Sequence, residues 1–309
     1  MTGRRRRLSV GLMTEIATIQ ANGLSFGYLE AGSGPLALCL HGFPDSAHTW
    51  RHLLPALADA GYHAVAPFLR GYAPTDVPKD GAYQVGALAA DANALHEAFG
   101  GDADAVLIGH DWGAAATYAA VAHAPERWRR AVAMALPPFG AMLSSFFDYA
   151  QLKRSFYIFL FQTPLAETAV LMEDMAFLDG LWADWSPGYD ATRDVAQVKE
   201  CLRDPENLAA AIGYYRAMLD PSRHLPAYAA EQEAAERVGE RPTLYLHGAA
   251  DGCLDAGLAR DVDGHLPPGS RSAIVAGAGH FAHLERPGEV ERLILDWLAD
   301  DGPVRTGAV

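Results

Sequence analysis

The chain of 309 residues is half hydrophobic and one-tenth aromatic, so it can bury a sizeable core, and a disordered chain is excluded. Its 38 acidic and 24 basic residues give a formal net charge of −14, which argues against nucleic acid or an anionic membrane surface as the main partner. The charge suits a protein that acts on neutral or cationic small molecules.

The chain begins with a segment that we expect to be a flexible tail, residues 1–23. Arg4 to Arg7 could open a targeting signal, but the apolar stretch after them is short and Glu15 interrupts it. The sequence holds no run of eighteen uncharged apolar residues of the transmembrane kind. Three widely spaced cysteines without CxxC pairing indicate a reducing cytoplasm.

From residue 24 onward, short apolar runs alternate with helical stretches, which is the pattern of an α/β protein with a mostly parallel sheet. Residues 24–32 have a period of two and predict an edge strand. Helices between the strands are clearest at 83–99 and 112–124. Continuous apolar runs predict six buried strands, at 35–42, 63–68, 104–109, 129–136, 242–248 and 271–277.

The pattern changes between residues 137 and 238, where helical, aromatic-rich sequence replaces the alternation of strands and helices. Half of the chain's aromatic residues lie in this segment. We therefore predict a helical cap domain over 137–238, inserted into an α/β core made of 24–136 and 239–300, with a tail at 301–309. An aromatic lid suits an apolar substrate.

Residues 108–114, IGHDWGA, put Asp111 in the Gly-x-nucleophile-x-Gly spacing of a strained turn between a strand and a helix. Gly109 and Gly113 would relieve crowding around a nucleophile in an unfavourable backbone conformation. A strand before the turn and a helix after it supply the context that the motif requires, and the helix N-terminus favours a negative charge. The alternative is that Asp111 only caps this helix.

Other segments supply the groups that such a nucleophile needs. The loop LHGFPDS (40–46) follows a strand, so the backbone amide of Phe43 and that of Trp112 are positioned to form an oxyanion hole. A plain tight turn is the alternative for this loop. Asp251 and His280 each follow a later strand, and the chain order nucleophile, acid, histidine is that of the α/β-hydrolases.

Two of these assignments have close competitors in the sequence. Asp255 lies near Asp251, and His283 lies one turn beyond His280. His280 is favoured because it directly follows the carboxyl end of a strand. We expect His283 to pack against its surroundings and His110 to be a neighbour of the elbow rather than a base. The histidines show no HExxH spacing, so no metal role is indicated.

A carboxylate is a poor nucleophile toward acyl groups but can displace a leaving group at a saturated carbon, which would form an alkyl ester on Asp111. Water activated by His280, itself oriented by Asp251, would then hydrolyse this ester while the oxyanion hole stabilises the tetrahedral intermediate. These residues predict a hydrolase that works without a cofactor.

The segments HGFPD, FLRGYAPTD, GHDWGA and GHFAHLERP together resemble the epoxide hydrolase branch of the α/β-hydrolase superfamily, over nearly the whole chain from 24 to 300. The resemblance implies an α/β-hydrolase fold with a helical cap and an enzyme that acts on a small apolar epoxide. A homodimer is a possible assembly, but the sequence does not decide the oligomeric state.

The resemblance also extends to two cap segments. SFYIFLFQTP (155–164) and GYYRAML (213–219) resemble the family segments that carry ring-opening tyrosines, which would be Tyr157 and Tyr215. Ordinary core packing is the alternative for both tyrosines. The aromatic residues that we expect to contact the substrate are Phe43, Trp112 and Phe161.

Haloalkane dehalogenases also use an aspartate nucleophile and are the alternative function. An opening epoxide leaves an alkoxide that calls for a phenol donor, whereas a departing halide needs only N–H donors. Phe43 stands where many haloalkane dehalogenases have asparagine, and Trp112 occurs in both families. Trp182 or Trp185 could offer a second indole donor to a halide, but their helical context favours packing. We therefore favour epoxide hydrolysis.

Overall fold

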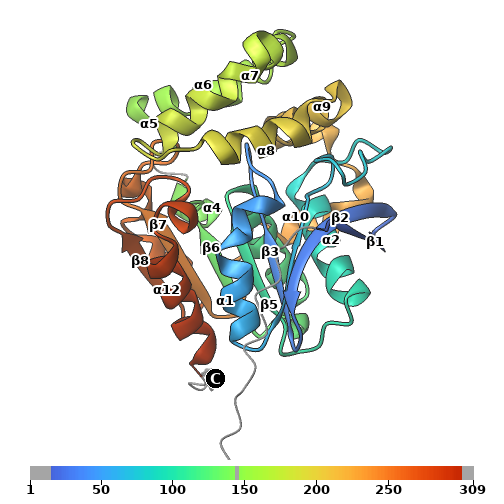
Figure 1. Cartoon of the computed structure of the whole chain (residues 1–309), viewed down its shortest axis with the longest axis vertical. Coiled ribbons are helices and arrows are strands. Elements are labelled where there is room, and N and C mark those ends of the chain that lie inside the picture. Colours follow the sequence, from blue (N-terminus) through green and yellow to red (C-terminus); the bar gives the residue numbers. More distant parts are fainter. Residues whose placement is uncertain (1–14, 143–145, 301–309) are drawn as a thin grey trace, which may run out of the picture.

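The computed structural model describes residues 15–142 and 146–300, and within them one mixed sheet of eight strands forms the centre of the molecule (Figure 1). The strand order is β1-β2-β4-β3-β5-β6-β7-β8. β2 is antiparallel to β1 and β4, and the strands from β4 to β8 run parallel. The bounds are β1 Ala17–Ala21, β2 Leu24–Gly32, β3 Leu36–Leu40, β4 His63–Pro67, β5 Val106–His110, β6 Arg130–Met134, β7 Thr243–Gly248 and β8 Arg271–Val275.

Helices cover both faces of the sheet. α1 (Leu53–Asp59) and α12 (Pro287–Ala299) pack together on one face, and α2 (Val85–Ala98) and α3 (Trp112–His123) pack together on the other (Figure 1). Every residue of β3, β5, β6 and β7 is buried, because both of their faces are covered. This explains why these strands are continuous apolar runs without alternation. The predicted α/β class is confirmed.

The predicted strands and helices are present, with ends within two residues of the expected positions, but the edges of the sheet differ from the prediction. β2 was expected at the edge and lies inside, because β1 pairs with its outer side. β8 was expected to be buried and forms the far edge, where Ile274 is 51% exposed. Whether a strand lies at the edge depends on which strands become its neighbours. The hydrophobic pattern of one strand does not reveal this position.

β1 also corrects the expected N-terminal tail. Residues 17–21 pair with β2 through a hairpin whose turn is Asn22-Gly23. Both turn residues have positive φ, 45° and 75°, as a two-residue hairpin turn of type I′ requires. The Asn-Gly pair was therefore a strand signal that the tail prediction overlooked. Residues 1–14 of that predicted tail and the predicted tail at 301–309 lie outside the described residues.

Between β6 and β7 the described chain is helical. Figure 1 shows α5 to α9 as a layer above the sheet. α10 instead packs against α2 and α3, and a Cβ on Gly86 of α2 would lie 2.6 Å from the carbonyl oxygen of Tyr228. The chain thus rejoins the core before residue 229, earlier than the predicted cap boundary. The bounds are α4 Phe139–Met142, α5 Tyr149–Arg154, α6 Phe156–Leu160, α7 Ala166–Trp185, α8 Thr192–Leu202, α9 Pro205–Leu219 and α10 Ala229–Ala234.

Shorter elements complete the chain. α11 (Ala282–Glu285) precedes α12, and 3₁₀ turns lie at Ala47–Arg51, Pro125–Arg127, Pro221–Arg223, Pro226–Tyr228, Ala256–Ala259 and Val262–His265. Among the described residues, no helix is both long and apolar enough to cross a bilayer.

Candidate active site

Asp111 lies at the sharp turn between β5 and α3. Its backbone has φ 53° and ψ −117°, a strained conformation for a residue with a side chain. A Cβ on Gly109 would lie 2.1 Å from the carbonyl oxygen of Gly113, and a Cβ on Gly113 would lie 2.1 Å from that of Leu40. Both glycines are therefore required by close backbone contacts. Within the described residues, the Asp111 side chain makes no capping hydrogen bond to α3, so the helix-cap alternative is wrong.

The Asp111 carboxylate points into the loop that follows β3. The backbone amide of Phe43 donates a hydrogen bond of 2.8 Å to Asp111 Oδ1, and the nearby amide of Trp112 helps to lower the pKa of the carboxyl group. These are the two amides expected to form the oxyanion hole. Burial raises the pKa of Asp111 above its ordinary value, against the opposing effects of His280 and the two amides.

His280 and Asp251 form a buried pair beside Asp111. His280 Nδ1 donates to Asp251 Oδ2 at 2.9 Å, and His280 Nε2 lies 3.8 Å from Asp111 Oδ2. Burial by itself would lower the pKa of His280. The negative charge of Asp251, with a smaller effect of Asp111, outweighs burial and raises this pKa above its ordinary value. The backbone amides of Cys253 and Leu254 hold the other oxygen of Asp251, at 2.7 and 2.9 Å. The three predicted residues therefore come together in the geometry of a catalytic triad.

The competing residues have other contacts. Asp255 is half-exposed, pairs with Arg154 and accepts a hydrogen bond from the amide of Gly257. His283 is buried, bonds Thr49 through Nε2, and stacks on Trp50 with ring centroids 5.0 Å apart. The choice of His280 and Asp251 over these neighbours therefore agrees with the geometry.

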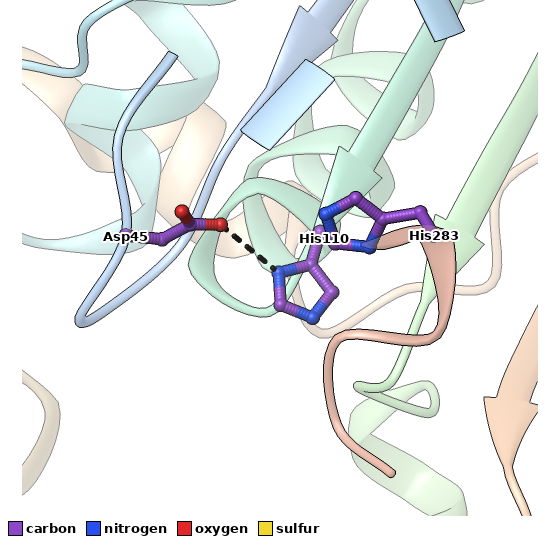
Figure 2. A group of neighbouring side chains, drawn as sticks. All are labelled: Asp45, His110 and His283. Atoms are coloured by element: carbon purple, nitrogen blue, oxygen red, sulfur yellow. Dashed lines mark ion pairs between the residues drawn. The ribbon is translucent and has the colours of Figure 1, made fainter. Parts of the chain in front are cut away.

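A buried polar cluster lies behind His280. Figure 2 shows Asp45 facing His110, with His283 beside them, and one ligand atom from each residue lies within 4.8 Å of the other two. His110 Nε2 donates to the carbonyl oxygen of His280 at 3.0 Å, so the cluster supports the backbone of the base. Burial lowers the pKa of both His110 and His283, the latter to about 3, and raises that of Asp45, which favours uncharged side chains. The sequence did not indicate this cluster, because its residues come from three separate segments.

The two cap tyrosines face the same space as Asp111. Tyr157 comes from α6 and Tyr215 from α9, and their rings meet edge to face with centroids 5.4 Å apart. Tyr215 also packs against Trp112 at 5.2 Å. Burial raises the pKa of both phenols well above the ordinary value, so both keep their protons at neutral pH. The other tyrosines considered are positioned differently: Tyr214 donates to the carbonyl of Arg70, Tyr149 is exposed, and Tyr228 contacts Arg70.

A cavity of about 560 Å³ opens above Asp111, between the core and α4, α6 and α9. Its size is that of a pocket for a small organic molecule. Its inner wall contains Asp111, Trp112, Tyr157, Tyr215 and Cys253. His280 lies behind the carboxylate, buried in the core. Cys253 was not anticipated, although its position two residues after Asp251 was a usable signal. Aromatic and aliphatic side chains form the outer wall, among them Leu136, Phe139, Met142, Phe146, Phe147 and Leu219.

The expected substrate contacts of Phe43 and Phe161 are wrong. Both rings are fully buried, and they pack against each other with centroids 5.5 Å apart. Each ring also packs against Tyr215, at 5.2 Å, so these aromatics support the phenols from behind instead of lining the cavity. For Phe43, the contribution to the site is its backbone amide. Trp112 does line the cavity, as expected.

The two tryptophans considered as halide donors have structural roles. The indole N–H of Trp182 donates to the carbonyl of Pro44 at 2.9 Å, and its ring stacks on Phe281. Trp185 is buried against Tyr157 and His280, with ring centroids 5.1 and 5.0 Å away. This arrangement gives no support to a second indole donor in the cavity.

The parallel sheet, the nucleophile elbow and the order of the triad define an α/β-hydrolase. The family profile described as "alpha/beta hydrolase fold" matches residues 35–172. The chain is 32% identical to the AB hydrolase superfamily protein YfhM of Bacillus subtilis, over 91% of this chain and 96% of that protein. It is 30% identical to epoxide hydrolase 3 of Mus musculus, over 94% and 78% of the two chains.

Solved structures agree with these sequence similarities. The Bacillus megaterium epoxide hydrolase, determined with an inhibitor, superposes with a TM-score of 0.78 at 25% identity, covering 92% of this chain and 100% of the other. Epoxide hydrolase A of Mycobacterium thermoresistibile has a TM-score of 0.75 at 27% identity, covering 92% and 98%. The chain belongs to the α/β-hydrolase superfamily, in its epoxide hydrolase branch.

Proposed function

We propose that this protein is an epoxide hydrolase, which converts an epoxide and water to a vicinal diol through an alkyl ester on Asp111. The observation that carries the proposal is the arrangement around the cavity, where the Asp111 carboxylate faces the two protonated phenols of Tyr157 and Tyr215. Relatives named epoxide hydrolase in Mycobacterium tuberculosis and Mus musculus support it. The aromatic wall suits a small apolar epoxide.

The first half-reaction forms the ester. Because the Phe43 amide holds Asp111 Oδ1, the oxygen free to attack is Oδ2. Oδ2 forms a bond to a ring carbon while the epoxide C–O bond breaks, and a phenol donates its proton to the oxygen that leaves the carbon. The products of this step are the hydroxyalkyl ester of Asp111 and a tyrosinate.

The second half-reaction hydrolyses the ester. His280 Nε2, which has no hydrogen-bond partner in the described part of the chain, takes a proton from water as the water oxygen attacks Cγ of Asp111. Negative charge develops on Oδ1, to which the amide of Phe43 already donates, and the amide of Trp112 is the second donor of the proposed oxyanion hole. The intermediate then collapses to the diol and the free carboxylate. Asp251 stabilises the imidazolium, whose proton restores the phenol.

A single turnover in ¹⁸O-labelled water tests this route. With enzyme in excess over styrene oxide, we expect the diol to carry only unlabelled oxygen and the peptide containing Asp111 to gain one ¹⁸O, because water attacks the ester carbonyl. His280→Asn should accumulate the alkyl-enzyme, which mass spectrometry detects as an adduct on the same peptide. Label in the diol with none in Asp111 would refute the covalent route.

A double variant of the two phenols separates the proposal from haloalkane dehalogenation. Replacing Tyr157 and Tyr215 together with phenylalanine should abolish epoxide turnover, because no phenol remains to protonate the alkoxide. A dehalogenase would instead release bromide from 1-bromobutane and keep that activity in the double variant. Bromide release by the wild type, without turnover of any epoxide in a panel, would favour the dehalogenase.

A further inference from the structure

The side chain of Cys253 lies on the loop after β7, between the acid of the triad and one of the two phenols. Its backbone amide donates to Asp251 Oδ1, and its thiol is buried in the wall of the cavity. Sγ lies 3.5 Å from the hydroxyl oxygen of Tyr157, which is within hydrogen-bonding distance for sulfur. Among the described residues, this thiol is the hydrogen-bond partner of that hydroxyl.

The two phenols therefore differ in their surroundings. The Tyr157 hydroxyl is tied to the thiol, whereas the buried hydroxyl of Tyr215 makes no hydrogen bond within the described residues. A phenol O–H lies near the ring plane in one of two orientations, so a neighbouring partner decides which way the proton and the lone pairs point. Among the described residues, Tyr157 has such a partner and Tyr215 has none.

We propose that Cys253 is a positioning residue for ring opening, whose thiol orients the Tyr157 hydroxyl toward the epoxide oxygen. The inference rests on the proposed function, since it concerns the phenols of that reaction. In the ring-opening step the proton passes from Tyr157 to the departing oxygen, and the S–H group donates to the phenolate oxygen that remains. The thiol keeps its own proton throughout. Burial raises the pKa of Cys253, which agrees with a thiol that stays protonated.

The proposed role of Cys253 predicts different effects on the two half-reactions. Tyr157 takes part in forming the alkyl-enzyme, whereas Asp251 and His280 take part in hydrolysing it. A thiol that acts through Tyr157 changes the rate of alkylation alone. A residue that merely holds the loop would disturb Asp251 and would slow hydrolysis as well.

The experiment measures both half-reactions by rapid quench with styrene oxide. For Cys253→Ala we expect alkylation to slow by about 3- to 10-fold, the loss of one modest hydrogen bond, with hydrolysis of the alkyl-enzyme unchanged. Cys253→Ser keeps a donor and an acceptor and should recover most of the rate. Cys201→Ala is the matched control, because Cys201 is buried on α8 and does not line the cavity. It should leave both steps unchanged.

A second test asks whether the effect passes through Tyr157. In a Tyr157→Phe background, Cys253→Ala should cause no further loss, because the hydroxyl that it orients is gone. A loss of the same size in that background would overturn the inference. Equal slowing of both half-reactions, or no change in either, would also overturn it. Cys253→Val fills the space without a hydrogen bond and provides the same measurement if the alanine variant does not fold.

The outcomes for the wild type separate the two proposals. If the wild type forms no alkyl-enzyme with any epoxide, the proposed function fails and this inference fails with it. If the wild type forms the alkyl-enzyme and Cys253→Ala does so at the same rate, the inference fails alone.

Discussion

Removal of the Tyr215 hydroxyl is expected to change stability and activity in opposite directions. It is buried, and among the described residues it has no hydrogen-bond partner. In Tyr215→Phe the ring packing against Trp112 and Phe43 is kept, and only the unpaired hydroxyl is lost. We therefore expect a variant that is more stable and less active than the wild type.

The magnitudes follow from the local environment. A buried hydroxyl without a partner costs about 1–3 kcal/mol, so its removal should stabilise the fold by about 1 kcal/mol. In a chain of this size that corresponds to a rise of about 1.5 °C in Tm. Proton donation contributes roughly 10²- to 10⁴-fold to catalysis, and Tyr157 remains, so alkylation should slow by about 10- to 100-fold.

Tyr214→Phe is the matched control on the same helix. The Tyr214 hydroxyl donates a hydrogen bond of 2.8 Å to the carbonyl of Arg70, so its removal should destabilise the fold by about 1 kcal/mol and leave alkylation intact. Thermal and urea unfolding, together with the rate of alkylation by styrene oxide, measure both effects. A Tyr215→Phe variant that unfolds more easily than the wild type and keeps its full alkylation rate would refute the reasoning.

Two further predictions concern the base and the nucleophile. Because Asp251 raises the pKa of His280 above its ordinary value of 6.5, the neutral base is lost as pH falls through that raised pKa, and ester hydrolysis should slow there. Asp251→Asn should move this limb of the single-turnover pH profile to lower pH; an unmoved limb would contradict the assignment. A Cβ on Gly42 would lie 2.4 Å from Asp111 Oδ1, so Gly42→Ala should displace the carboxylate and slow alkylation by about 10²-fold. In Gly180→Ala the added Cβ meets no described atom within 4 Å, so wild-type rates are expected; equal rates in both variants would argue against the steric reason.

Much of the site follows from local sequence. The elbow was predictable because Gly109 and Gly113 relieve contacts within one short turn, and because a strand and a helix flank Asp111. The order of Asp111, Asp251 and His280 was predictable for a similar reason, since each follows the carboxyl end of a strand and parallel strands bring those ends to one edge of the sheet. Local geometry and periodicity are properties of neighbouring residues, which a sequence records directly.

Other features depend on which distant segments meet. The direction of Phe161 could not be predicted, because successive side chains on a helix differ by about 100° and the partners that bury this ring come from other segments. The Asn22-Gly23 hairpin was readable, but the edge position of β8 was not, because it requires the order of the whole sheet. The contact of Cys253 with Tyr157 joins residues 96 positions apart. The sequence by itself determined the nucleophile and the chemistry that it permits; the tertiary structure alone decided which side chains surround it, because long-range packing positions each of them.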